Sequence, residues 1–100
     1  MSAPIDHRKL YGGAIDAMLP GVRDDEERDL RARLLLARDV ATQNVAKLSG
    51  HPQHLNLMIA ETAGAFAFAS VSAEHLQIAI AQCRRLMACA AGAELLERGR

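Results

Sequence analysis

One carboxylate, Glu61, stands in the most apolar stretch of the chain, residues 55–71 (LNLMIAETAGAFAFASV). In a helix, His54 lies about two turns before Glu61 on nearly the same face. A glutamate and a histidine on one buried face could act as general base and general acid, with an arginine from a neighbouring helix binding the substrate. The competing interpretation places Glu61 on the least covered edge of its helix, or pairs it with an arginine. Glu61 and His54 are therefore the candidate catalytic residues.

Histidine and cysteine side chains offer a second kind of chemistry. His51, His54 and His75 could meet near the turns between helices, with Cys83 or Cys89 completing a metal site. The spacing of these residues matches no standard zinc pattern. The two cysteines are six residues apart, a rise of about 9 Å, and lie on different faces of one helix, so they do not pair with each other. We therefore expect no metal and no cofactor, and we expect Cys83 to be a small core residue.

Arginines occur in pairs on two predicted helices. Arg31 and Arg38 share one side of the second helix, and Arg84 and Arg85 lie midway along the fourth. Such pairs could bind a small dianion between helices. Ordinary solvated helix faces with ion pairs at four-residue spacing explain most such arginines.

The segment 46–60 contains an alanine and a glycine four residues apart before a helix, as a helix-turn-helix does. Asn56, however, stands where that motif requires an apolar residue. The second helix of the pair, QHLNLMIA, carries no lysine or arginine for phosphate or guanine contacts. The formal net charge of the chain is zero. We therefore expect that nucleic acid is not the partner, and a nucleic-acid-binding regulator is kept as a second alternative.

Composition and periodicity together predict an all-α fold. Half of the residues are apolar but only 3% are aromatic, and alanine and leucine dominate, a composition that favours helices. We expect a single domain over 1–100, built as a compact bundle of four helices at about 4–19, 24–49, 53–70 and 73–97, running up-down-up-down. Asp24 and Ser72 are suited to cap the second and fourth helices. Because residues 53–70 are apolar almost all round, we expect this helix to be the buried central one.

Both long helices carry more apolar residues than one stripe needs. On the second helix the main stripe is Leu30, Leu34, Ala37, Ala41, Val45 and Leu48, and on the fourth it is Leu76, Ala79, Ile80, Cys83, Leu86, Met87 and Ala90. The surplus positions predict a homodimer with an isologous interface. The residues expected to line that interface are Leu35, Leu36, Val40, Ile78 and Leu96.

These observations favour a small non-enzymatic protein-interaction module, an adaptor, inhibitor or regulatory subunit that binds another protein or a second copy of itself. The sequence contains no nucleophile–base triad and no glycine-rich phosphate loop. The alternative is a small enzyme or ligand-binding bundle that uses Glu61 and His54 with an arginine. No apolar run reaches the ~18 uncharged residues of a membrane span, and two cysteines without a signal peptide indicate the cytoplasm.

The predicted dimer has a direct test in the substitution Leu36→Glu. Burying a charge in an apolar interface is unfavourable, so the variant should have the mass of a monomer where the wild-type chain has the mass of a dimer. Light scattering after size exclusion, over a range of concentrations, measures both masses. Equal masses for the two proteins would exclude Leu36 from a dimer interface.

Overall fold

Four helices follow one another along the chain, α1 (His7–Met18), α2 (Asp25–Ala46), α3 (Gln53–Ala67) and α4 (Ala73–Arg98). The computed structural model describes the backbone of residues 6–47 and 52–98, and the side chains of these residues as far as 92. No strand occurs within these ranges, so the all-α four-helix bundle is confirmed. The expected helix boundaries at residues 4 and 49, and the stripe residue Leu48, lie outside the described residues. None of the described helices is both long and apolar enough to cross a bilayer.

The helix starts follow local hydrogen-bonding rules. Asp24 caps α2, where its carboxylate accepts a hydrogen bond of 2.9 Å from the backbone N–H of Glu26. Ser72 likewise accepts from the backbone N–H of His75 at the start of α4. At the start of α1, Asp6 accepts from two backbone N–H groups of the first turn. The sequence predicted the caps at Asp24 and Ser72, whereas the cap at Asp6 was not expected.

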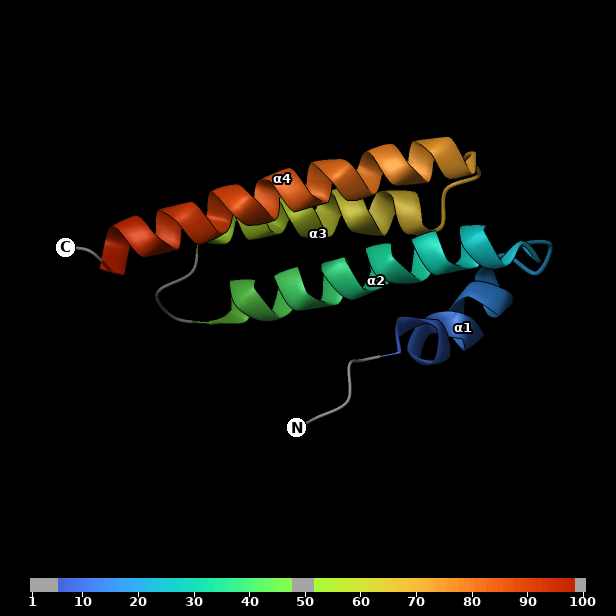
Figure 1. The fold of residues 1–100 in the computed structure, drawn as a ribbon. Helices are drawn as coiled ribbons and strands as arrows, with labels where there is room; N and C mark the ends of the chain where they lie inside the picture. The colour runs from blue at the N-terminus through green and yellow to red at the C-terminus, as the bar shows by residue number, and fades with distance from the viewer. Residues whose placement is uncertain (1–5, 48–51, 99–100) are drawn as a thin grey trace.

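The helix around which the bundle is arranged is α2. It packs against each of the other three helices, whereas α1, over its described residues, packs against α2 alone. Figure 1 shows α2, α3 and α4 side by side and alternating in direction, so that α2 and α4 begin at the same end of the bundle. The short helix α1 lies against the first half of α2.

The expectation that the third helix is the buried central one is wrong. Within α3 the buried residues form a single stripe, namely Asn56, Ile59, Ala63 and Ala67. On its outer side Leu57 is 48% exposed and Met58 is 39% exposed. The cause is the position of α1, which packs on α2 and leaves the outer face of α3 uncovered. The helix with partners on several sides is therefore α2, in which Leu34 and Leu35 are both fully buried.

The core is one continuous cluster to which all four helices contribute. The stripes predicted for the two long helices supply much of it, with Leu30, Leu34 and Ala41 from α2 and Leu76, Ala79 and Cys83 from α4. From α1 come Tyr11 and Ile15, and from α3 come Ile59, Ala63 and Ala67. The small alanines of α3 allow its backbone to approach α2 closely.

A buried arginine joins α2 to the turn between α3 and α4. Arg31 is 1% exposed. Its Nη1 donates to the backbone carbonyls of Ala67 at 2.9 Å and Ala69 at 2.7 Å, and its Nη2 and Nε donate to Glu27 Oε1 at 2.8 and 3.1 Å. Carbonyls at the end of a helix lack intrahelical donors and carry the negative end of the helix dipole, so a guanidinium group is well suited to them. Arg31 is therefore a structural residue and is not available to bind a dianion.

Replacing this arginine tests its role. Arg31→Met retains most of the side-chain volume but removes the guanidinium donors from the buried Ala67 carbonyl and from the Glu27 carboxylate. Breaking a buried, hydrogen-bonded charge pair costs roughly 3–5 kcal/mol, so we expect the free energy of unfolding to fall by about 3 kcal/mol. Urea unfolding followed by circular dichroism measures the change. Arg23→Met, at an exposed position whose side chain forms no hydrogen bond with another described residue, is the matched control and should change stability by less than about 0.5 kcal/mol. Equal stability of the two variants would contradict the role of Arg31.

Candidate functional site

An open groove runs along the seam between α2 and α4 in the described part of the molecule. Its volume is ≈ 430 Å³. Residues from both helices line it, and one residue of α1 closes one end. The lining residues are His7, Arg33, Leu34, Leu36, Ala37, Val40, Ile80, Cys83, Arg84 and Met87.

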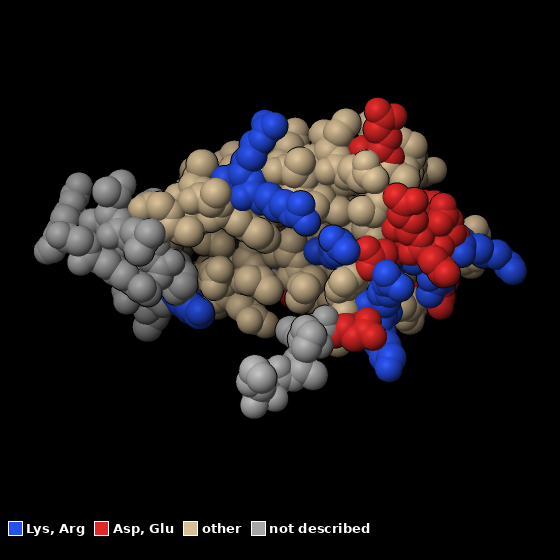
Figure 2. Space-filling model, in the orientation of Figure 1, with Lys and Arg blue, Asp and Glu red and all other residues tan. Residues whose placement is uncertain are grey.

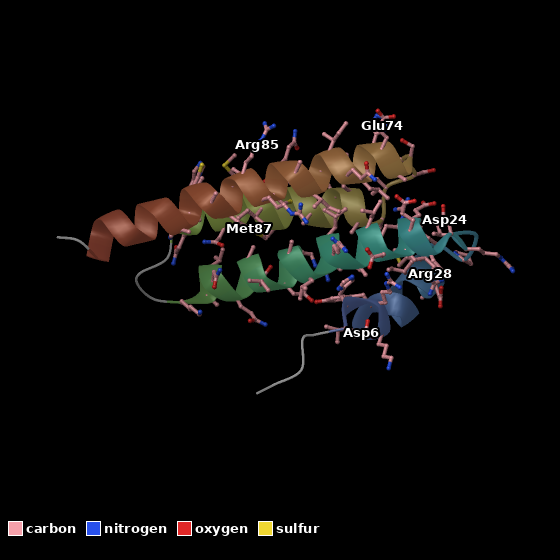
Figure 3. All side chains as sticks on the ribbon, viewed as in Figure 1. Asp6, Asp24, Arg28, Glu74, Arg85 and Met87 are labelled. Atoms are coloured by element: carbon pink, nitrogen blue, oxygen red, sulfur yellow. The ribbon has the colours of Figure 1, made fainter. Side chains whose placement is uncertain are left out.

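The floor and the walls of the groove have different burial. Leu34 and Cys83 form the floor and are almost completely buried. On the walls, Leu36, Ile80 and Met87 are half-buried, and Val40 is 44% exposed. Figure 3 shows Met87 pointing from α4 toward α2, whereas Arg85 points away from the bundle. An apolar surface that opens to solvent in this way is suited to receive an apolar side chain from another molecule.

A smaller hollow continues the groove along the bundle. It has a volume of ≈ 150 Å³, and Met87 lines both hollows. From α2 its lining includes Asn44, one turn beyond Val40, and from α4 it includes Ala90 and Ala91. Asn44 donates to the side-chain oxygen of the buried Asn56 at 3.3 Å, so this end of the groove is polar but uncharged.

The opposite end of the groove is cationic and is organised by the buried carboxylate of Asp29. His7 Nε2 lies 2.5 Å and Arg8 Nε 2.9 Å from Asp29 Oδ1, and Arg33 Nε lies 2.8 Å from Asp29 Oδ2. Burial by itself would raise the pKa of Asp29, but the hydrogen bonds from Arg8 and His7 and the charges of Arg33 and His7 outweigh it and lower the pKa to about 2. Asp29 is therefore ionised at neutral pH and ties α1 to α2.

The cysteine in the groove is a packing residue. Burial raises the pKa of the Cys83 thiol, so the thiol is protonated and apolar at neutral pH. Cys89 is exposed on another face of α4, as the six-residue spacing predicted. Among the residues with described side chains, no three histidine, cysteine or acidic groups converge on a common point. His51, one of the histidines considered for a metal site, lies outside the described residues.

The structure does not bring the candidate catalytic residues into a pocket with an arginine. Glu61 and His54 are both exposed on the outer face of α3, the face that α1 leaves uncovered. No hydrogen bond or ion pair links either side chain to another described residue, and neither lines the groove between α2 and α4. The interpretation in which Glu61 lies on the uncovered edge of its helix therefore describes the structure.

The five residues expected at an interface have different locations. Leu36 and Val40 line the groove. Leu35 is fully buried in the core of the chain itself, because α2 is covered on more sides than one stripe would allow. Ile78 is 52% exposed on α4 but does not line the groove. The side chain of Leu96 lies outside the described part of α4.

Several groove residues were not identified as site residues from the sequence. Ile80 and Met87 belong to the main stripe of the fourth helix and were assigned to its core, and Arg33 was not considered. Arg84 was interpreted as part of a solvated face. The signal that could have identified the groove is the wide apolar arc on both long helices, which predicts surplus apolar surface without locating the seam.

Comparisons of the chain with protein-family models, with curated proteins and with solved structures find no match. The groove and its charged end are therefore the basis for inferring a function.

The buried carboxylate predicts a specific dependence of stability on acid. The pKa of Asp29 is lowered in the folded chain from an ordinary value of 3.8 to about 2. A lowered folded-state pKa contributes stability above the unfolded-state value, and this contribution is lost as the pH falls from about 4 to 2. We expect Asp29→Asn to lower the free energy of unfolding by about 1–2 kcal/mol at pH 7, and this difference from wild type to shrink toward pH 2.

Urea unfolding at several pH values measures this dependence. Asp25→Asn removes an exposed carboxylate from the same helix and serves as the control, with a small difference from wild type at every pH. A difference between wild type and Asp29→Asn that stays constant from pH 7 to 2 would show that Asp29 is not held ionised by its neighbours.

Proposed function

We propose that this chain is a non-enzymatic protein-interaction module, an adaptor, inhibitor or regulatory subunit, that binds a helical segment of a partner protein in the groove between α2 and α4. The single observation that carries the proposal is the open apolar groove, whose walls are Leu36, Val40, Ile80 and Met87. Grooves of this kind between two helices bind the apolar face of a third helix.

The energetic argument rests on the apolar surface left in water. Burial of apolar surface contributes roughly 25 cal/mol per Å². Val40 and the half-buried walls of the groove gain this contribution only when another apolar surface covers them. The floor of Leu34 and Cys83 is already packed, so the groove exists before the partner binds and little ordering of α2 and α4 is needed.

A second copy of the chain is the alternative occupant, as in the homodimer expected from the sequence. Groove-to-groove pairing of two copies by a two-fold axis would bring the same residues of both copies together. In a parallel pairing Arg33 and Arg84 would lie near their equivalents, which like charges disfavour, and in an antiparallel pairing they would face the uncharged end, so neither pairing gives them a carboxylate partner. Figure 2 shows basic side chains over this face of the bundle and acidic side chains gathered at one end. We therefore favour a different protein as the partner.

The two cysteines support a reducing compartment such as the cytoplasm for this module. Both thiols are free, and Cys89 is exposed. Exposed free thiols are usual in reducing compartments and uncommon in oxidising ones.

A selection experiment tests the proposed function. A display library of helical peptides is selected against the immobilised chain, and the enriched peptides are then tested on two variants. Val40→Asp places a charge on the groove wall and should weaken binding at least about tenfold, because the carboxylate loses water when the groove is covered. Gln43→Asp, on the same helix and exposed away from the groove, should leave binding within about twofold.

Two results would contradict the proposal. One is the failure of any peptide to be enriched while the chain also remains monomeric at high concentration. The other is enrichment of peptides that bind the Val40→Asp variant as well as wild type. A wild-type mass that doubles with concentration, and does not do so in Val40→Asp, would assign the groove to a second copy of the chain.

A further inference from the structure

We infer that the segment bound in the groove is an acidic amphipathic helix of about three turns, whose apolar stripe lies between Val40 and Met87 and whose carboxylates face Arg33 and Arg84. This inference rests on the proposed function and specifies the chemistry of the partner. Three observations carry it, namely the length of the groove, the distribution of its apolar residues and its charge.

The length of the groove suits a helix. On α2 the lining residues run from Arg33 to Asn44, and on α4 they run from Ile80 to Ala91, twelve residues in each case. The eleven steps from the first of these residues to the last rise about 16 Å, which is three turns. Because α2 and α4 begin at the same end of the bundle, the two walls run in the same direction. A bound helix would place apolar side chains at positions i, i+4, i+7 and i+11 along this trough.

The apolar residues lie in the middle of the trough. Leu36 and Val40 face Ile80 and Met87 across the seam, above the floor of Leu34 and Cys83. The far end is polar and neutral, since the Asn44 amide is bonded to Asn56. A ligand with an apolar stripe and uncharged residues at one end therefore matches this part of the groove.

The positive charge lies at the other end and on the α4 wall, where Arg84 stands between Ile80 and Met87. Arg84 is exposed and forms no ion pair with any residue whose side chain is described. Arg33 is 46% exposed at its side chain and shares the Asp29 carboxylate with Arg8 and His7. Two arginines and a histidine thus surround the Asp29 carboxylate, and with Arg84 the groove carries excess positive charge. Carboxylates from the partner would form charge-assisted hydrogen bonds with Arg33 and Arg84.

The acidic residues of the chain itself lie outside the groove. Asp24, Asp25 and Glu26 are at the start of α2, about two turns before Arg33, and Figure 2 shows acidic side chains gathered at that end of the bundle. None of them lines the groove. Because these residues repel other carboxylates, the acidic part of a bound helix should not extend beyond Arg33 toward the start of α2.

Two synthetic peptides test the inference. Both are acetylated and amidated helices with leucines at positions i, i+4, i+7 and i+11 and alanine or glutamine elsewhere. One carries a cluster of glutamates at one end and the other carries lysines at the same positions. Fluorescence anisotropy measures their dissociation constants for the wild-type chain. The glutamate peptide should bind at least about tenfold more tightly, and its affinity should fall as salt is added.

Charge reversal on the protein provides the matched control. Arg84→Glu should weaken the glutamate peptide about tenfold or more and strengthen the lysine peptide. Arg85→Glu changes charge equally at the next position, but Arg85 points away from the bundle and does not line the groove, so both affinities should stay within about threefold of wild type. Circular dichroism checks the fold of both variants, and because both positions are exposed we expect both variants to be folded.

The outcomes separate this inference from the proposed function. Equal affinity for the two peptides, unaffected by Arg84→Glu but lost in Val40→Asp, would overturn the acidic preference and leave the groove as a docking site. Binding that is unaffected by either variant would overturn both proposals. Failure of both peptides to bind, together with self-association that Val40→Asp abolishes, would overturn the acidic partner and identify a second copy as the occupant.

Discussion

A single buried guanidinium group connects the three long helices of this bundle. Arg31 projects from α2 into the turn between α3 and α4 and donates to the carbonyl of Ala67, the last residue of α3, and to the carbonyl of Ala69 in the turn. Glu27, one turn earlier on α2, balances its charge. Because the carbonyls lie on the chain between α3 and α4, the same side chain sets where α4 begins relative to α2. The seam that forms the groove depends on this placement.

The position of α1 is the second constraint on the surface of the molecule. Hydrogen bonds from His7 and Arg8 to Asp29, and from Tyr11 to Asp39, hold α1 on α2. With α1 in that place, no described helix covers the outer face of α3, and the residues there remain in solvent. The same contacts put His7 at one end of the groove. The network around Asp29 thus both fixes α1 and supplies positive charge to the candidate site.

The groove combines properties that individually are common. An apolar seam between two helices occurs in many bundles, and arginines are frequent on helix surfaces. Here the apolar walls occupy the middle of a three-turn trough, with Arg33 and His7 at one end, Arg84 on the α4 wall and neutral amides at the other end. This asymmetry would give a bound helix a direction as well as an affinity. Charge at the rim contributes mainly to specificity and to the rate of association, and the apolar walls contribute most of the affinity.

The sequence by itself determined the properties that depend on neighbours in the chain. Helical periodicity and the capping groups of Asp24 and Ser72 act within a turn or two, so the all-α class, the number of helices and the main stripes of α2 and α4 were predictable. Only the tertiary structure decided which helix is central, that Leu35 is in the core, and that Glu61 is exposed. A helix that is apolar all round can be covered on every side or on one, and the choice depends on where a distant segment packs. Here that segment is α1, whose long-range ion pairs with α2 leave no signal in the periodicity of either helix.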